Sequence, residues 1–245
     1  MTWPVVCATG HREVPAGTEP WVRAELGRCA AWLREQGTRY AISGMARGVD
    51  LWWAQAALDA DLALCAAIPF AEQTDPWSKP DRAEWQRIRA LATREHIVGE
   101  LPAGVGPRQR SAAVNRALHA RNDFMLDRST AVVAVWERGK LDGGTHSALV
   151  KAARRRMPGV WLDPAAQVVA FELPDLADLL KYALYHGICG CIAATGTQHD
   201  MELLRAAHQD AGLHHWRLRP ARPREAAVTG CSTCTRAPEK ELTAP

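Results

Sequence analysis

The chain has 245 residues, a hydrophobic content of 47%, a charged content of 23% and a formal net charge of +3 at pH 7. This length allows one sizeable domain with a smaller appendage, and the composition is that of an ordinary globular protein. The mild positive charge argues against a nucleic-acid-binding surface, and no apolar run is long enough to span a bilayer. Since the N-terminus also lacks a secretory signal, we expect a cytoplasmic protein without a membrane partner.

Three polar loops each follow a predicted buried strand. The first strand covers residues 3–8 and ends at the T-G-H-R motif of residues 9–12. The second covers residues 40–42 and ends at the S-G-M-A-R-G-V-D loop of residues 43–50. A third apolar run precedes the G-G-T turn of residues 143–145. Glycine permits tight turns, while threonine, histidine and arginine supply groups that hydrogen-bond to a ligand. The glycine pair also exposes backbone N–H groups at a helix start, which favours an anion; a plain helix cap is the alternative.

The remaining segments alternate between helix and strand patterns. Helices are predicted over residues 20–36, 49–58, 81–94 and from Ser111 through Asn122, and further strands over 62–68, 96–98, 131–136 and 160–162. Buried-type strands that alternate with helices predict an α/β fold, with a parallel sheet and helices on both faces. Because the carboxyl ends of parallel strands meet at one sheet edge, the three loops are expected to form one ligand pocket.

The predicted domain organisation has three parts. The α/β domain is expected to occupy residues 1–164, and a small, mostly helical appendage residues 165–218. Residues 219–245 are polar and contain prolines, which predicts a disordered tail. Within the appendage, the predicted elements are an edge strand over 168–171 and amphipathic helices over 174–185 and 200–211.

Seven cysteines occur in the chain, and their odd number argues against a disulfide framework. Cys7, Cys29 and Cys65 lie in apolar segments, where a free thiol behaves as a small hydrophobic side chain. Four further cysteines have spacings that could hold a tetrahedral zinc ion, with idle thiols as the alternative. These four are Cys189, Cys191, Cys231 and Cys234. No metal or other cofactor is part of the expected function.

Together the loop motifs resemble the SLOG superfamily of Rossmann-like proteins over about residues 5–164. This superfamily includes YpsA-like proteins, the DNA-processing protein DprA and the LOG phosphoribohydrolases. The resemblance rests on T-G-H-R, on S-G-M-A-R-G-V-D, on I-P-F after the third strand, and on R-N ahead of G-G-T. The G-V-D element at residues 48–50 is most similar to the YpsA-like branch. The resemblance implies a Rossmann-like fold with a pocket for a nucleotide or nucleotide-derived ligand.

Enzymatic activity is left open by this resemblance. LOG enzymes carry a catalytic glutamate three residues after the threonine of their glycine motif, where this chain has Ala148. Their arginine on the preceding helix is matched by Arg121, but the lysine after it is Asn122. Cleavage of an N-glycosidic bond needs an acid or base near the ribose, so another carboxylate would have to substitute. The candidates are Asp50, Asp127 and Asp142.

Asp50 and Arg121 each have two interpretations. Asp50 binds a ribose hydroxyl or a water, or it stabilises the dipole of the helix in whose first turn it lies. The resemblance implies that Arg121 binds phosphate. An antiparallel helix would carry its C-terminal end to the far sheet edge, so this role needs a bent helix or a neighbouring subunit. The alternative is a surface arginine paired with Asp123 or Glu137.

The leading expectation is the binding of a nucleotide or ADP-ribose-like small molecule, as sensor or carrier. The alternatives are a nucleoside or nucleotide N-glycosidase or ribosyl transferase, and DprA-like binding of single-stranded DNA. The mild charge disfavours nucleic acid as a partner. A homo-oligomer is left open, and no catalytic residue is assigned. The candidate ligand-binding residues are Thr9, Gly10, His11, Arg12, Ser43, Gly44, Met45, Ala46, Gly48, Asp50, Arg121, Asn122, Gly143, Gly144 and Thr145.

Overall fold

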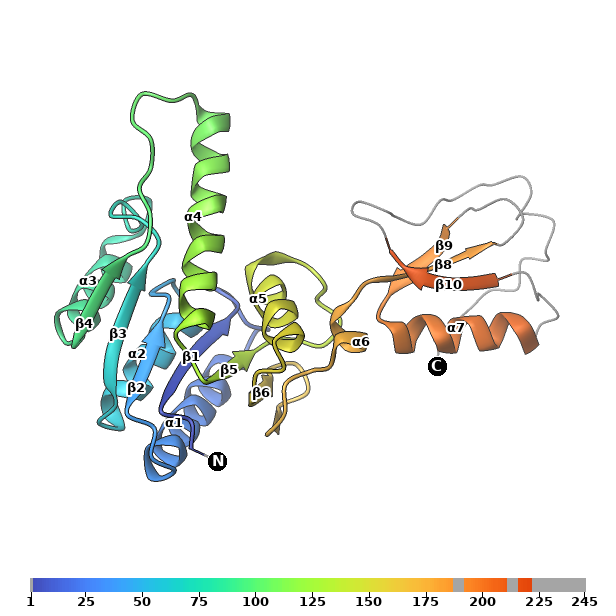
Figure 1. Cartoon of the computed structure of the whole chain (residues 1–245), viewed down its shortest axis with the longest axis horizontal. Helices are drawn as coiled ribbons and strands as arrows, with labels where there is room; N and C mark the ends of the chain where they lie inside the picture. Colours follow the sequence, from blue (N-terminus) through green and yellow to red (C-terminus); the bar gives the residue numbers. More distant parts are fainter. Residues whose placement is uncertain (1, 187–191, 211–215, 222–245) are drawn as a thin grey trace. The chain divides into compact units, whose positions relative to one another are not determined.

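The computed structural model describes residues 2–186, 192–210 and 216–221. The chain divides into two compact units, Met1–Pro174 and Asp175–Pro245 (Figure 1). The first unit extends beyond the 1–164 range expected from the sequence. The reason is strand β7 (Val168–Ala170), which pairs antiparallel with β6 (Gly159–Asp163) and so joins the main sheet. The edge strand predicted near residues 168–171 is therefore present.

The first unit is built on a seven-stranded sheet in the order β4-β3-β2-β1-β5-β6-β7. All neighbouring pairs are parallel except β6 with β7, which confirms the predicted α/β, Rossmann-like architecture. The other strands are β1 (Val5–Gly10), β2 (Tyr40–Ser43), β3 (Ala63–Ile68), β4 (Arg94–Ile97) and β5 (Ala131–Val135). The chain moves outward from β1 to β4 and then returns to β5 on the other side of β1. The carboxyl ends of β1 and β5 are therefore the switch point at which ligands bind in open α/β sheets.

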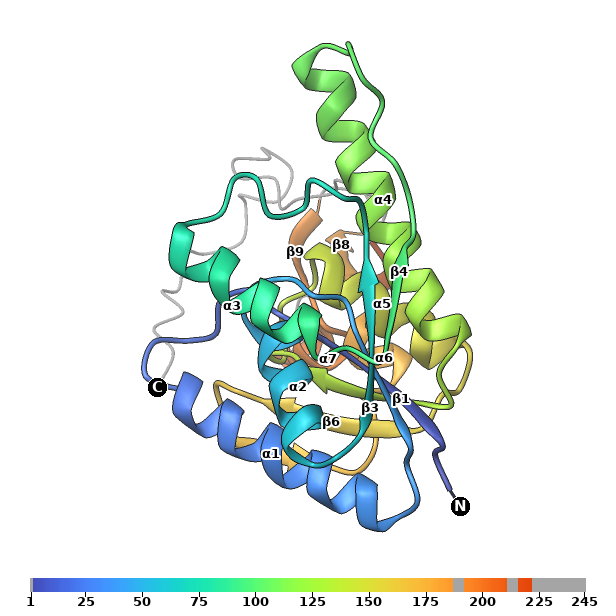
Figure 2. The same ribbon diagram turned by 90° about the vertical axis from the view of Figure 1, so that its left-hand side faces the viewer.

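Five helices cover the two faces of this sheet (Figures 1 and 2). Right-handed crossovers place helices on opposite faces when the direction of winding reverses. The chain reverses after β4, so the helices before and after that point lie on different faces. One face carries α1 (Glu19–Glu35), α2 (Val49–Asp59) and α3 (Lys79–Ala90), and the other carries α4 (Pro107–Asp127) and α5 (Gly143–Arg154).

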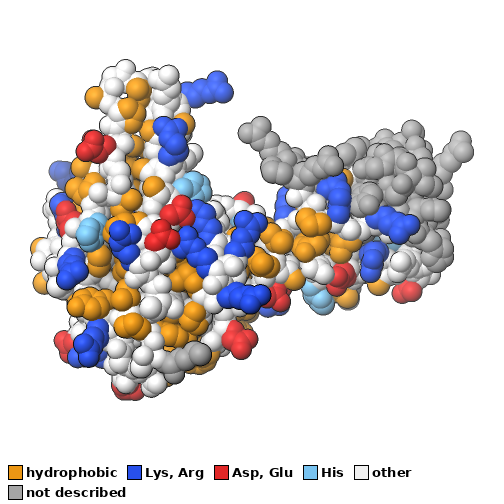
Figure 3. Space-filling model, viewed as in Figure 1, with side chains coloured by type: hydrophobic (Ala, Val, Ile, Leu, Met, Phe, Trp, Pro, Cys, Tyr) orange, Lys and Arg blue, Asp and Glu red, His pale blue; other side chains and the backbone are white. Residues whose placement is uncertain are grey.

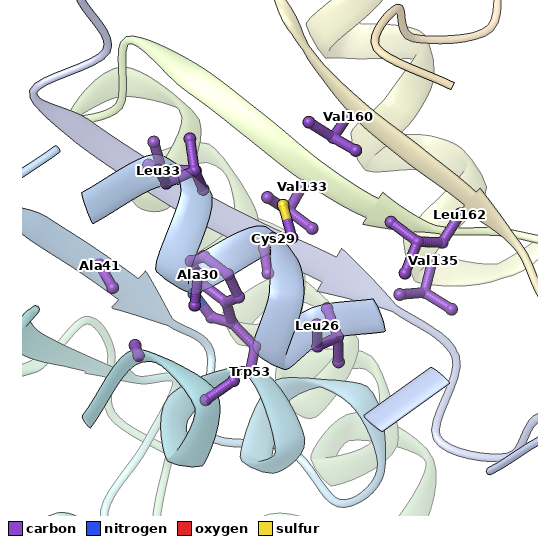
Figure 4. Close-up of a cluster of buried hydrophobic side chains, with 14 of the residues drawn as sticks. Leu26, Cys29, Ala30, Leu33, Ala41, Trp53, Val133, Val135, Val160 and Leu162 are labelled. Atoms are coloured by element: carbon purple, nitrogen blue, oxygen red, sulfur yellow. The ribbon is translucent and has the colours of Figure 1, made fainter. Parts of the chain in front are cut away.

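The main core lies between the sheet and helices α1 and α2 (Figure 4). Leu26, Ala30 and Leu33 recur every three or four residues along α1, and all three are completely buried. They pack with Trp53 of α2 and Val133 of β5, among others. The indole Nε1 of Trp53 donates to the carbonyl oxygen of Ile42 at 3.2 Å, so its polar atom stays paired inside the core.

The described part of the second unit contains a three-stranded antiparallel sheet in the order β10-β8-β9, beside two helices. Its elements are α6 (Leu176–Leu179), β8 (Tyr182–His186), β9 (Ile192–Gly196), α7 (Gln198–Asp210) and β10 (Trp216–Pro220). The prediction of a helix over 174–185 is wrong, because α6 has four residues and the chain continues as β8. Strand β8 pairs on both edges, and such tertiary pairing outweighs a local helical pattern. The appendage is thus a mixed unit rather than a mostly helical one.

The cysteine predictions are tested in part. Cys7 and Cys29 are buried free thiols, and burial raises the pKa of Cys7 to about 11 and that of Cys29 to about 12. Cys189, Cys191, Cys231 and Cys234 lie outside the described residues, as does most of the predicted disordered tail. Elsewhere, the described residues contain no cluster of side chains suited to a metal ion. None of the described helices has the length and apolar character needed to cross a bilayer.

Candidate functional site

A cavity of about 680 Å³ opens at the carboxyl ends of β1 and β5, the switch point of the sheet. Its walls come from four segments: the turn after β1, the loop leading into α2, the middle of α4, and the loop leading into α5. The lining residues are Thr9, Gly10, His11, Arg12, Glu13, Ala46, Asp50, Asn115, Leu118, His119, Arg121, Asn122, Lys140, Gly143, Gly144 and Thr145. The three loops that the sequence analysis singles out therefore meet at one site.

The candidate residues from the sequence fall into two groups. Eleven of them line the cavity: Thr9, Gly10, His11, Arg12, Ala46, Asp50, Arg121, Asn122, Gly143, Gly144 and Thr145. The other four, Ser43, Gly44, Met45 and Gly48, lie behind it and do not line it. Their contacts show that they shape the loop between β2 and α2.

Ser43 organises this loop through two buried hydrogen bonds. Its hydroxyl donates to the carbonyl oxygen of Asp50 at 2.7 Å and accepts from the backbone N–H of Met45 at 3.1 Å. Met45 is completely buried with a φ of 54°, and its carbonyl accepts a hydrogen bond from Gln73 Nε2 at 2.8 Å. A non-glycine residue in the left-handed region persists where its surroundings determine it. The loop is therefore a rigid support for Asp50.

Two glycines of the loop allow the walls of the cavity to approach one another. A Cβ atom on Gly44 would overlap the guanidinium of Arg121 and approach Asp50 Oδ2 to 2.6 Å. Gly48 has a φ of 78°, and a Cβ atom there would overlap the backbone of Arg12. Gly44 thus makes room for a side chain from α4, and Gly48 for the turn after β1.

Arg121 and Asp50 form a buried ion pair beside the cavity. Nη1 of Arg121 donates to Oδ2 of Asp50 at 2.7 Å, and the two side chains are 9% and 6% exposed. The same carboxylate oxygen accepts the backbone N–H of Ala46 at 3.3 Å. Nε of Arg121 is buried and has no hydrogen-bond partner among the described residues. Asp50 is therefore a partner of Arg121, and the suggested pairing of Arg121 with Asp123 or Glu137 is wrong.

The length of α4 explains how Arg121 reaches the cavity. The helix has 21 residues, and Arg121 stands nearly two turns before its last residue, Asp127. The final turns of α4 lie along the sheet, while its first half extends beyond the sheet (Figure 1). Arg121 therefore lines the cavity at the carboxyl ends of β1 and β5. Within this chain, its contact with Asp50 needs neither a bent helix nor a neighbouring subunit.

The start of α5 presents backbone donors to the cavity. Gly143, with a φ of 80°, and Gly144 form the first turn of this helix after Asp142. Asn122 Nδ2 donates to the carbonyl oxygen of Gly144 at 3.3 Å, which ties α4 to this turn. No atom of the described residues lies within 4 Å of the Cβ position of Gly143. Unoccupied N–H groups at the positive end of a helix dipole bind anions.

The charged side chains around the cavity favour an anionic ligand. Arg12 and Lys140 line it, are exposed, and make no ion pair with any described residue. Arg121 adds a third cation, against the two carboxylates of Glu13 and Asp50. Since Asp50 is neutralised by Arg121, the described lining presents two unpaired cations and one unpaired carboxylate, and Asp142 lies close enough to act electrostatically on His11.

His11 is a half-buried imidazole in this electropositive environment. Its Nε2 atom is buried and has no hydrogen-bond partner among the described residues. Burial, followed by the nearby charge of Lys140, lowers the pKa of His11 to about 4. The ring is therefore neutral at pH 7, and its Nε2 atom is enclosed by the protein.

The lowered pKa of His11 predicts a stability that declines in acid. Unfolded histidine titrates near pH 6.5. Between about pH 6.5 and pH 4 the unfolded chain binds a proton that the folded chain does not. The free energy of unfolding should therefore fall as the pH is lowered through this window. Urea titrations at pH 7 and pH 5 should show a smaller decline for His11→Gln than for the parent chain. The exposed neighbour His119 supplies the control, His119→Gln, and an equal decline in all three proteins would contradict the prediction.

Five lining residues are absent from the candidates drawn from the sequence: Glu13, Asn115, Leu118, His119 and Lys140. Three of them, Asn115, Leu118 and His119, precede Asn122 on α4 and share its helical face. A search of positions three, four and seven residues before Asn122 would have found them.

Among the aspartates considered as acids, Asp127 pairs with Arg155 at 2.8 Å and does not line the cavity. Asp142 does not line it either, and Asp50 is held by Arg121.

Comparison with known proteins supports the identification made from the motifs. No family model matches the chain. The UPF0398 protein YpsA of Bacillus subtilis is 29% identical over 139 residues, covering 55% of this chain and 71% of YpsA. The structure of DprA from Helicobacter pylori has a TM-score of 0.45 at 18% identity, covering 67% of this chain and 71% of that one. A molybdenum cofactor binding protein from Rippkaea orientalis has a TM-score of 0.41 at 18% identity, covering 66% and 78%. The sequence match confirms the resemblance to YpsA-like proteins. The structural matches give no basis for transferring what those proteins bind.

Proposed function

We propose that this chain, a homologue of YpsA-like proteins, binds a nucleotide or an ADP-ribose-like molecule as a sensor or carrier. The observation that carries the proposal is the cavity of about 680 Å³, in which the first turn of α5 lies beside the unpaired cations Arg12 and Lys140. Small-molecule sites typically have volumes of about 300–1,000 Å³. The cavity thus matches the size and charge of a phosphorylated small molecule.

In the proposed complex, a phosphate lies against the N–H groups of Gly143 and Gly144, with Arg12 and Lys140 supplying counter-charges. His11 contributes a neutral imidazole that hydrogen-bonds to the ligand. The pair of Arg121 and Asp50 forms the floor of the cavity. The ligand thus meets polar groups from all four wall segments.

N-glycosidic cleavage is the second candidate function, because two groups suited to proton transfer line the cavity. These groups are the unpaired carboxylate of Glu13 and the neutral imidazole of His11. Against this function, the position of the LOG glutamate holds Ala148, which is buried, and Asp50 is already ion-paired. Binding without cleavage is therefore the better-supported proposal.

Binding of single-stranded DNA is the least supported alternative. On the face seen in Figure 3, the described basic side chains lie among acidic and apolar ones. Affinity for nucleic acid rests on extended rows of lysine and arginine with interleaved aromatic side chains. A gel shift with single-stranded DNA at several salt concentrations tests this alternative, and tight binding at physiological salt would favour it.

Gly144→Val should weaken nucleotide binding at least ten-fold while the protein stays folded. The described atom nearest to a Cβ atom at Gly144 is Asn122 Nδ2 at 3.8 Å, so the substitution causes no clash at this atom. The valine side chain would occupy the proposed phosphate position. Losing a charged hydrogen bond costs about 1.5–3 kcal/mol, which corresponds to a ten-fold or larger loss of affinity. Calorimetry with AMP and ADP-ribose measures the effect, and mass spectrometry of the same mixtures shows whether any bond is broken.

Gly27→Val is the matched control, since Gly27 of α1 also has open space around its Cβ position and lies away from the cavity. It should bind as the parent does. Equal affinity of parent and folded Gly144→Val would contradict the phosphate position. Release of a free base would move the assignment to an N-glycosidase.

A further inference from the structure

Helix α4 presents a stripe of side chains to the cavity, running from the level of Arg121 toward the start of the helix. Asn115, Leu118, His119 and Asn122 all line the cavity. Their spacing of three, four and seven residues places them on one helical face. The first half of α4 extends beyond the sheet (Figure 1). Asn115 belongs to this half, and Leu118 and His119 follow in the next turn. We call these four residues the α4 stripe.

The α4 stripe has two ends with different surroundings. Asn122 is bonded to the first turn of α5, at the proposed phosphate position. Asn115 lies seven residues earlier, about 10 Å further along the helix axis. A ligand anchored at α5 must therefore be elongated to reach Asn115. This layout matches a molecule with an anionic group at one end and a second recognised group at the other.

The chemistry at the far end of the stripe fits a flat heteroaromatic ring. Asn115 is exposed and lines the cavity, and its amide offers an adjacent donor and acceptor. Leu118 is partly buried and presents apolar surface, which packs well against the face of a ring. An asparagine amide pairs in bidentate fashion with the amino group and N7 of adenine. A sugar or a second phosphate would leave the apolar surface of Leu118 unused.

We infer that the α4 stripe recognises the base of the ligand, with Asn115 as the residue that selects an adenine-type ring. This inference rests on the proposed function and specifies which part of the ligand each wall binds. The phosphate lies at the start of α5, the ribose passes His11, and the base packs on Leu118. Asn115 is a specificity-determining residue in this arrangement, outside the motifs that carry the family resemblance.

The inference is tested by comparing AMP, inosine monophosphate and ribose 5-phosphate in calorimetry. The parent chain should bind AMP at least ten-fold more tightly than either of the other two. Ribose 5-phosphate lacks a base, and hypoxanthine presents two acceptors where adenine presents a donor and an acceptor. Asn115→Leu keeps the branched shape and the number of side-chain heavy atoms and removes the amide, so it should bring the affinity for AMP close to that for inosine monophosphate. Its affinity for ribose 5-phosphate should not change.

Arg116→Ala is the matched control, because Arg116 is an exposed neighbour on α4 that does not line the cavity. It should keep the preference for AMP. The inference is overturned if Asn115→Leu binds AMP as the parent does, or if the parent binds AMP no more tightly than ribose 5-phosphate. In those cases a loss of binding in Gly144→Val would still support the phosphate site and the proposed function. Failure of the parent to bind any of these compounds or ADP-ribose would overturn both.

Discussion

Arg121→Ala is expected to lower the free energy of unfolding by about 3–5 kcal/mol, the range for breaking one partner of a buried ion pair. The carboxylate of Asp50 is 6% exposed and would keep only the Ala46 N–H at 3.3 Å as a described hydrogen-bond donor. For a chain of this size the change corresponds to a fall of about 6–20 °C in melting temperature. Urea titration and thermal unfolding measure it.

Two further variants test whether the destabilisation by Arg121→Ala comes from breaking the buried pair rather than from removing an arginine in general. Arg155 pairs with Asp127 at 2.8 Å, but the two side chains are 40% and 54% exposed. Arg155→Ala should therefore cost about 0–1 kcal/mol. The double variant Arg121→Ala with Asp50→Asn should be more stable than Arg121→Ala alone, because it removes the unpaired charge and keeps an acceptor for Ala46. If the two single arginine variants are equally stable, the buried pair is not the cause.

Gly48→Ala should destabilise the chain by about 2–6 kcal/mol, through two separate costs. The φ of 78° and ψ of −131° lie in a region that glycine alone adopts readily, and strain there costs about 1–3 kcal/mol. The new Cβ atom would also overlap the backbone of Arg12, and overpacking adds about 1–3 kcal/mol. The turn after β1 would have to move, which disturbs the hydrogen bond from Val49 N to His11 O at 3.3 Å. Nucleotide affinity should fall together with stability.

Gly17→Ala is the control for backbone strain without a clash. Gly17 has a φ of 81°, and no atom lies within 4 Å of its Cβ position. Its replacement should cost about 1–2 kcal/mol, the strain of the left-handed conformation alone. Equal destabilisation by the two variants would show that the contact between Gly48 and Arg12 has no energetic role.

Some features of the site follow directly from local sequence patterns. Buried strands read as apolar runs, and glycine loops mark where those strands end, so the position of the three loops was predictable from residues 9–12, 43–50 and 143–145. The alternation of such strands with helices also determined the parallel sheet. Parallel strands present their carboxyl ends at one edge, and this geometry brought the loops together.

The pattern of a glycine loop does not show which of its residues face a ligand. From the sequence, the loop at Ser43 and Gly44 is as good a candidate for ligand binding as the turn at Gly143 and Gly144. In the structure, Ser43 bonds to Asp50, and Gly44 accommodates Arg121, whose own partner Asp50 lies 71 residues earlier in the chain. The contact between Gly44 and Arg121 joins segments distant in the chain, and local periodicity carries no information about it.

The sequence by itself determined the α/β architecture, the buried strands and the three loops, since each depends on burial and backbone freedom within a short segment. Three features became clear only from the tertiary structure: Arg121 pairs with Asp50, Asn115 lines the cavity, and residues 182–186 form a strand. The pair of Arg121 and Asp50 forms because α4 crosses the sheet in the connection from β4 to β5, which brings Arg121 to Asp50. The reach of Asn115 depends on how far α4 extends beyond the sheet. Strand β8 exists because two neighbouring strands pair with it, a stabilisation that outweighs the helical pattern of its own residues.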